Sequence, residues 1–176
     1  MKIKSFLLLL AVSLAMVACI DNTGTHTTPQ MMLGNLYVNP QFEGDSLIGA
    51  KDTLGDYYDT TLDLIYLDTL QLGDTVMFPA LFSSDMNNLV SVYSTYDTTR
   101  VNMWFQIDME NDAVKKALTA DSKPEKSKLF FNPMYNIVTF PIYIVPQEAG
   151  SYPIVLTVVS DSNFPTYSVA FTLPVK

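Results

Sequence analysis

The stretch that decides the fold is VNMWFQID, residues 101–108. Apolar and polar side chains alternate along it, and this period of two places successive side chains on opposite faces of a β-strand. Trp104 falls on the polar side of the strand. The side that we expect to face a hydrophobic core is formed by Val101, Met103, Phe105 and Ile107.

A similar alternation recurs through most of the chain after Gly34. Segments rich in Val, Ile, Thr, Tyr and Phe are separated about every 8–12 residues by clusters of turn-forming residues. Residues 111–120 differ, because their apolar positions recur at helical spacing behind a candidate cap, Asn111 or Asp112. The pattern predicts an all-β domain with one short inserted helix at about 111–120. The further strand candidates are 36–38, 62–67, 76–82, 89–93, 138–144, 154–159 and 167–173.

The N-terminus has the organisation of a secretory leader. Lys2 and Lys4 precede an apolar segment, residues 6–17, that is too short to span a bilayer as a permanent helix. The segment ends in Ala18-Cys19 and gives way to a polar stretch. An apolar segment of this length behind basic residues predicts a secretory signal peptide.

The junction at Cys19 resembles the lipobox of bacterial lipoproteins, in which a cysteine is acylated, for example with palmitate, before the leader is cut. Met16 stands where the family usually has leucine. The resemblance implies a signal peptide at 1–18 and a lipidated Cys19. A flexible tether over 19–33 and a single domain over 34–176 would follow.

Composition excludes several classes of function. Without Lys2 and Lys4, 8 basic side chains face 18 acidic ones, so the mature chain has a formal charge of −10 and would repel nucleic acid. One cysteine cannot form an intramolecular disulfide. The one histidine, His26, falls in the expected tether, which disfavours a catalytic triad or a histidine-based metal site.

Two stretches resemble PKD-type and related bacterial immunoglobulin-like domains: LQLGDTVMF, residues 70–78, and AGSYPIVLTVVSD, residues 149–161. The resemblance implies an immunoglobulin-like Greek-key β-sandwich with its core at about 62–176. It also implies a structural role for Tyr152, whose hydroxyl would bond back to an upstream backbone group. With its leader, the whole chain resembles the small immunoglobulin-like lipoproteins of Bacteroidetes.

The sequence gives catalysis little support. Nucleophilic catalysis needs a positioned base, and no histidine lies in the part expected to fold. Thirteen of the 18 acidic residues lie between Glu43 and Asp112, and two carboxylates in a cleft are what a glycoside hydrolase requires. A solvated acidic face is the simpler interpretation. We therefore expect no enzyme, metal site or cofactor, with a small carboxylate-based hydrolase as a remote alternative and calcium dependence left open.

Aromatic side chains give the sharper hypothesis for binding. Trp104 on a wet sheet face would suit stacking against a sugar ring, and loop tyrosines could lie beside it; the alternative is that Trp104 is covered as second-layer core. The candidate binding residues are Trp104, Tyr57, Tyr58, Tyr93 and Tyr96.

These observations favour a lipid-anchored binding or scaffolding module of the bacterial cell envelope, at the outer membrane. We expect its partners to be the membrane, through the anchor, and an envelope protein. Capture of a glycan is the alternative. The face of the outer membrane and the oligomeric state stay open.

Overall fold

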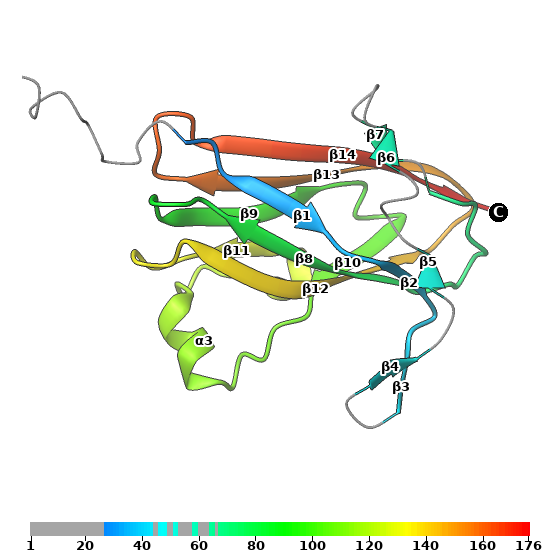
Figure 1. Cartoon of the computed structure of the whole chain (residues 1–176). Helices are drawn as coiled ribbons and strands as arrows, with labels where there is room; N and C mark the ends of the chain where they lie inside the picture. Colours follow the sequence, from blue (N-terminus) through cyan, green and yellow to red (C-terminus); the bar gives the residue numbers. More distant parts are fainter. Residues whose placement is uncertain (1–26, 44–45, 49–50, 53–57, 60–63, 66) are drawn as a thin grey trace, which may run out of the picture.

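The computed structural model describes residues 27–43, 46–48, 51–52, 58–59, 64–65 and 67–176, which form a β-sandwich (Figure 1). The first sheet contains β1 (Gln30–Leu33), β2 (Leu36–Val38), β5 (Lys51–Asp52), β8 (Val76–Ser83), β10 (Val101–Phe105) and β12 (Ile137–Pro146). The second contains β6 (Tyr58–Asp59), β7 (Leu64–Ile65), β9 (Leu89–Thr95), β11 (Lys128–Phe130), β13 (Gly150–Ser160) and β14 (Thr166–Val175). The remaining elements are a hairpin of β3 (Gln41–Glu43) and β4 (Ser46–Ile48), the helix α3 (Asp112–Ala117) and the 3-10 turn η1 (Pro124–Lys126).

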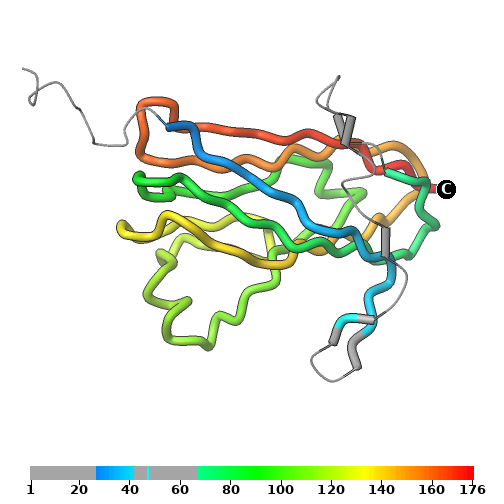
Figure 2. The backbone as a smooth tube through the Cα atoms, viewed as in Figure 1, coloured from blue at the N-terminus to red at the C-terminus, as the bar shows by residue number. Residues whose placement is uncertain are grey.

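Strands that are distant in the sequence are neighbours in both sheets. The first sheet has the order β10-β12-β8-β2-β5, and β1 also pairs with β8. The second has the order β11-β9-β13-β14-β7-β6, in which only β7 runs parallel to its neighbour β14. Figure 2 shows the two sheets stacked along their length, with β1 and β14 passing each other where the edges of the sheets meet. The all-β sandwich with one short helix is therefore confirmed.

The core lies between the sheets, and the alternation expected for residues 101–107 is confirmed there. The three inward side chains of β10 are at most 2% exposed, whereas Ile107, beyond the end of the strand, is half-buried. Phe78 of β8 meets Phe171 of β14 edge to face, with ring centroids 6.1 Å apart, and so joins the two sheets. Because each such side chain contributes about 1.5–3 kcal/mol on burial, this pattern stabilises the sandwich.

The inserted helix is real but shorter than expected. α3 begins after Asn111, whose side-chain oxygen accepts a hydrogen bond from the Ala113 N–H at 2.9 Å, and it ends at Ala117. Leu118, which follows the helix, is buried in the core, so the insertion is fixed to the sandwich at its C-terminal end. Within the described part of the chain, no helix is long and apolar enough to cross a membrane.

The expected tether over 19–33 is wrong at its C-terminal boundary. Residues 30–33 form β1, which pairs with β8 in the register Met31↔Phe82, and Met31 is buried in the core. The strand is only four residues long, and Met32 on its outer side is 67% exposed. A segment with so few buried positions has no detectable hydrophobic period of its own. It is extended because it pairs with β8.

Candidate functional site

The outer face of the first sheet is aromatic and apolar. Directly opposed residues of antiparallel strands share a face, so the register places Trp104 beside Tyr143 and Tyr143 beside Met77. Tyr37 of β2 continues this row on the other side of Met77. We call the outer-side residues of β8, β10 and β12 the aromatic face; they are Met77, Pro79, Leu81, Ser83, Asn102, Trp104, Ile137, Thr139, Pro141, Tyr143 and Val145. Of these, Met77 is buried, with 4% of its surface exposed.

Trp104 is held in place by its neighbours on this face. Its ring stacks on that of Tyr143, with centroids 5.1 Å apart and planes inclined by 8°. The indole Nε1–H donates to Oε1 of Gln106 at 3.3 Å. Both aromatic side chains are half-buried. Trp104 is therefore neither a buried core residue nor an isolated platform, because Tyr143 covers one face of its ring.

The structure does not bring Tyr93 or Tyr96 together with Trp104. Tyr93 lies on β9 opposite Thr157, on the outer face of the second sheet. Tyr96 is half-buried against the core, and its hydroxyl donates to the carbonyl oxygen of Met103 at 3.2 Å, so it links the turn after β9 to β10. Tyr57 lies outside the described residues, as does Cys19, and only the backbone of Tyr58 is described, in β6.

Tyr152 makes the hydrogen bonds that the resemblance implied. Its hydroxyl donates to the carbonyl oxygens of Glu148 and Ala149, at 3.1 and 3.0 Å. Gly150, which follows Ala149 in the chain, has a φ of +154°, and a Cβ there would lie 2.8 Å from the Tyr152 hydroxyl oxygen. The turn before β13 therefore needs glycine both for its backbone and for the approach of the ring.

An apolar pocket of about 380 Å³ opens beneath α3, where β10 ends. Val114, Leu118 and Phe140 are among the side chains that line it. Gln106 and Pro141 form part of its wall, and both adjoin the Trp104–Tyr143 stack on the aromatic face. The pocket and the aromatic face are thus one continuous uncharged region, except for Asp108 in the pocket wall.

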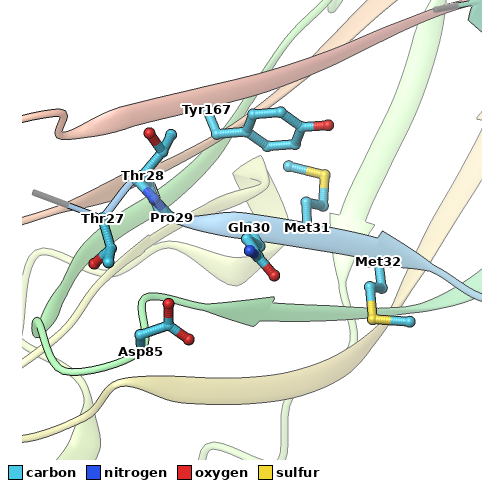
Figure 3. A pocket seen from close by; sticks show the side chains of 8 residues that line it. All are labelled: Thr27, Thr28, Pro29, Gln30, Met31, Met32, Asp85 and Tyr167. Atoms are coloured by element: carbon cyan, nitrogen blue, oxygen red, sulfur yellow. The ribbon is translucent and has the colours of Figure 1, made fainter.

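A second hollow, of about 550 Å³, lies between β1 and β14 (Figure 3). Tyr167 projects from β14 above Met31 of β1, and Asp85 borders the hollow at the turn after β8. Asp85 is the one carboxylate among its eight lining residues. The hollow therefore lacks the paired carboxylates on which glycoside hydrolysis depends.

The described residues offer little for acid–base or metal chemistry. Among them, no group of three or more His, Cys, Asp or Glu side chains could hold a metal ion. The pKa of Asp97 is held below its usual range chiefly because the Thr99 hydroxyl and N–H donate to it, at 2.6 and 3.0 Å. A catalytic general acid requires the opposite shift, so Asp97 stabilises the turn between β9 and β10.

No family model and no curated protein matches this chain. Among solved structures it is similar to the ASH / PapD-like domain 7 of human CEP192, with a TM-score of 0.35 and 15% identity over 65% of this chain and 81% of that one. It is also similar to a family 123 glycoside hydrolase from Clostridium perfringens, with a TM-score of 0.39 and 14% identity over 85% of this chain and 27% of that one.

The architecture itself is that of the immunoglobulin-like β-sandwich expected from the sequence. Two antiparallel sheets pack face to face, and Tyr152 bonds back to the turn before its strand.

Sequence reasoning missed Tyr143 and Tyr37, which share the face of Trp104. A signal for Tyr143 was present, because it alternates with Ile142 and Ile144 and so must point outward. Its position beside Trp104 depends on the pairing of β10 with β12, across the insertion that contains α3. That pairing has no local signature in the sequence.

Proposed function

We propose that this chain is a lipid-anchored binding or scaffolding module of the bacterial cell envelope, which engages a protein partner through the aromatic face. The observation that supports this is the stacked Trp104–Tyr143 pair, on a face whose outward positions on β8, β10 and β12 carry no charged residue. The centres of protein interfaces are depleted in charge and enriched in aromatic residues and methionine.

The second sheet provides an internal comparison. The outward residues of β13 and β14 are half small polar and half apolar, and none is charged; Thr157 and Ser168 hydrogen-bond to each other there at 2.9 Å. Lys128 on β11 lies over the ring of Phe130, 5.5 Å from its centroid. The aromatic face differs from this second outer face in its stacked Trp104–Tyr143 pair and in having no lysine on its three defining strands.

The anchor in this proposal comes from the lipobox-like junction at Cys19. Several acyl chains on that cysteine would hold the protein stably on a membrane, whereas a single chain would be marginal. The outer membrane is the proposed location, in line with the resemblance to Bacteroidetes lipoproteins. The proposal assigns no catalytic activity.

Site-specific photo-crosslinking in the native envelope tests the interface. A photoreactive amino acid at Tyr143 should form crosslinks to one or a few proteins. The same amino acid at Tyr93 should not, although Tyr93 is also a half-buried tyrosine at the middle of an outer face. Equal crosslinking from the two positions, or none from Tyr143, would refute the assignment of the aromatic face as the interface.

Glycan capture is the second candidate, and Trp104 is the observation that favours it. Trp104 is half-buried, and Asn102 and the hydrogen-bonded Gln106, two residues before and after it in the chain, carry amides that suit sugar hydroxyls. Retardation of the purified protein by one polysaccharide in a panel, lost in Trp104→Ala, would establish this function. Crosslinks from Tyr143 to protein would be unaffected by added polysaccharide if the first proposal holds.

A further inference from the structure

One end of the sandwich displays three exposed hydrophobic side chains on three neighbouring turns. These turns are residues 84–88 between β8 and β9, residues 131–136 between β11 and β12, and residues 161–165 between β13 and β14; together we call them the three-loop end (Figure 1). Met86 is 71% exposed, Met134 is 86% exposed and Phe164 is 57% exposed. Each turn thus contributes one large apolar side chain that the fold does not bury.

The three turns are joined into one surface by Asn88. Its main-chain N–H and its Nδ2 donate to the two carboxylate oxygens of Asp161, at 2.7 and 2.8 Å. Its Oδ1 accepts from the Met134 N–H at 2.9 Å, and its carbonyl oxygen accepts from the Asp161 N–H at 3.0 Å. The three apolar side chains therefore lie on turns that are hydrogen-bonded to one another and do not behave as independent loops.

Met134 is held in a backbone conformation that residues other than glycine rarely adopt. Its φ is +96°, in the region that favours glycine, while its side chain projects into solvent. Such a backbone costs free energy, and strain of this kind is found most often at binding and other functional sites. The arrangement exposes a methionine at the expense of stability.

The chain enters the sandwich at this same end. Nδ2 of Asn87 donates to Oγ1 of Thr27 at 2.6 Å, which fixes the first described residue to the turn after β8. Cys19 lies eight residues before Thr27, so an acyl anchor on it would keep this end within about 28 Å of the membrane surface. The opposite end lies farther away by the length of β13, whose eleven residues span about 36 Å.

We propose that the three-loop end is a membrane-docking surface, in which Met86, Met134 and Phe164 enter the interfacial region of the bilayer; this rests on the proposed acylation of Cys19. The three turns contain no basic residue, and their charged residues are Asp85 and Asp161. Docking is therefore driven by apolar burial and needs no anionic lipid. The sandwich stands upright on the membrane, with the aromatic face directed sideways toward a partner in the same plane.

The test uses the full-length protein, acylated by its bacterial host and reconstituted into vesicles of phosphatidylcholine and phosphatidylethanolamine. Nitroxide labels are placed singly by Met134→Cys, Phe164→Cys and Leu72→Cys. Leu72 is a matched control, because it is 53% exposed in the turn before β8, at the opposite end. Compared with the label at 72, which stays in water, we expect the labels at 134 and 164 to be less accessible to a water-soluble nickel chelate and more accessible to oxygen.

The outcomes separate this inference from the proposed function. Intact-mass measurement first shows whether Cys19 carries acyl chains; if it does not, the anchor is refuted and the docking inference falls with it. If Cys19 is acylated and the labels at 134 and 164 are as accessible to the nickel chelate as the label at 72, docking is refuted and the anchored module stands. Shielding that occurs in native envelopes but not in pure vesicles would assign the three-loop end to a protein contact and also refute docking.

Discussion

Replacing Met134 with glycine should stabilise the fold. A non-glycine residue in this backbone region costs about 1–3 kcal/mol, and the φ of Met134 is +96°. Glycine relieves that strain but adds freedom to the unfolded chain, which costs about 0.4–1 kcal/mol. The side chain is 86% exposed, so little burial is lost. The hydrogen bond to Asn88 uses the main-chain N–H and is retained.

The net expectation for Met134→Gly is a gain of about 1 kcal/mol, and at most about 2.6 kcal/mol, in the free energy of unfolding. Urea denaturation of the full-length protein in detergent, followed by Trp104 fluorescence, measures it as a higher midpoint with an unchanged slope. The midpoint temperature of thermal unfolding should rise by about 2–4 °C for each kcal/mol of added stability in a chain of this size.

Met86→Gly is the control, because Met86 is equally a methionine at the three-loop end and its φ is not positive. There the same substitution brings only the entropic cost, a loss of about 0.4–1 kcal/mol. The reasoning predicts opposite signs for two identical substitutions on adjacent turns. If Met134→Gly destabilises the protein as Met86→Gly does, the backbone at Met134 is not strained and the argument from strain is wrong.

Three further predictions concern the fold around the site. Gly150→Ala should cost about 1–3 kcal/mol in thermal unfolding, because it combines a positive φ with a Cβ that meets the Tyr152 hydroxyl. Asn111→Ala should cost about 0.5–2 kcal/mol through loss of the helix cap, and amide exchange should rise in α3 before it rises in β10. The lowered pKa of Asp97 means that its stabilisation of the turn is present above its unfolded pKa and is lost as pH falls through the folded value. The protection of the Thr99 amide, measured as its exchange rate relative to the intrinsic rate at the same pH, should therefore fall on acidification, and Asp97→Asn should remove that dependence.

The sequence predicted those strands that bury one face. Period-two runs located β8, β10, β12 and β14, and a nearly continuous apolar run over residues 154–159 located β13. β1 escaped prediction because its position depends on the edge of β8, and a four-residue strand has no period to detect.

The candidate site was predictable only in part. Alternation within β10 was enough to place Trp104 on an outer face, since that depends on one strand alone. Grouping it with Tyr93 failed, because the sheet to which a strand belongs is decided by pairing with distant segments. Tyr143 and Trp104 meet only through the register of β10 with β12, and Met86, Met134 and Phe164 gather only because three turns reach the same end.

Hydroxyl-radical footprinting of the intact envelope tests the central claim, that the aromatic face is buried against a protein partner, most directly. Oxidation of Trp104 is compared between the native envelope and the purified full-length protein, with Tyr93 on the opposite face as internal reference. The account predicts that Trp104 is strongly protected in the envelope while Tyr93 reacts equally in both samples. Equal oxidation of Trp104 in the two samples would contradict the account, because the aromatic face would then be open to water in the cell.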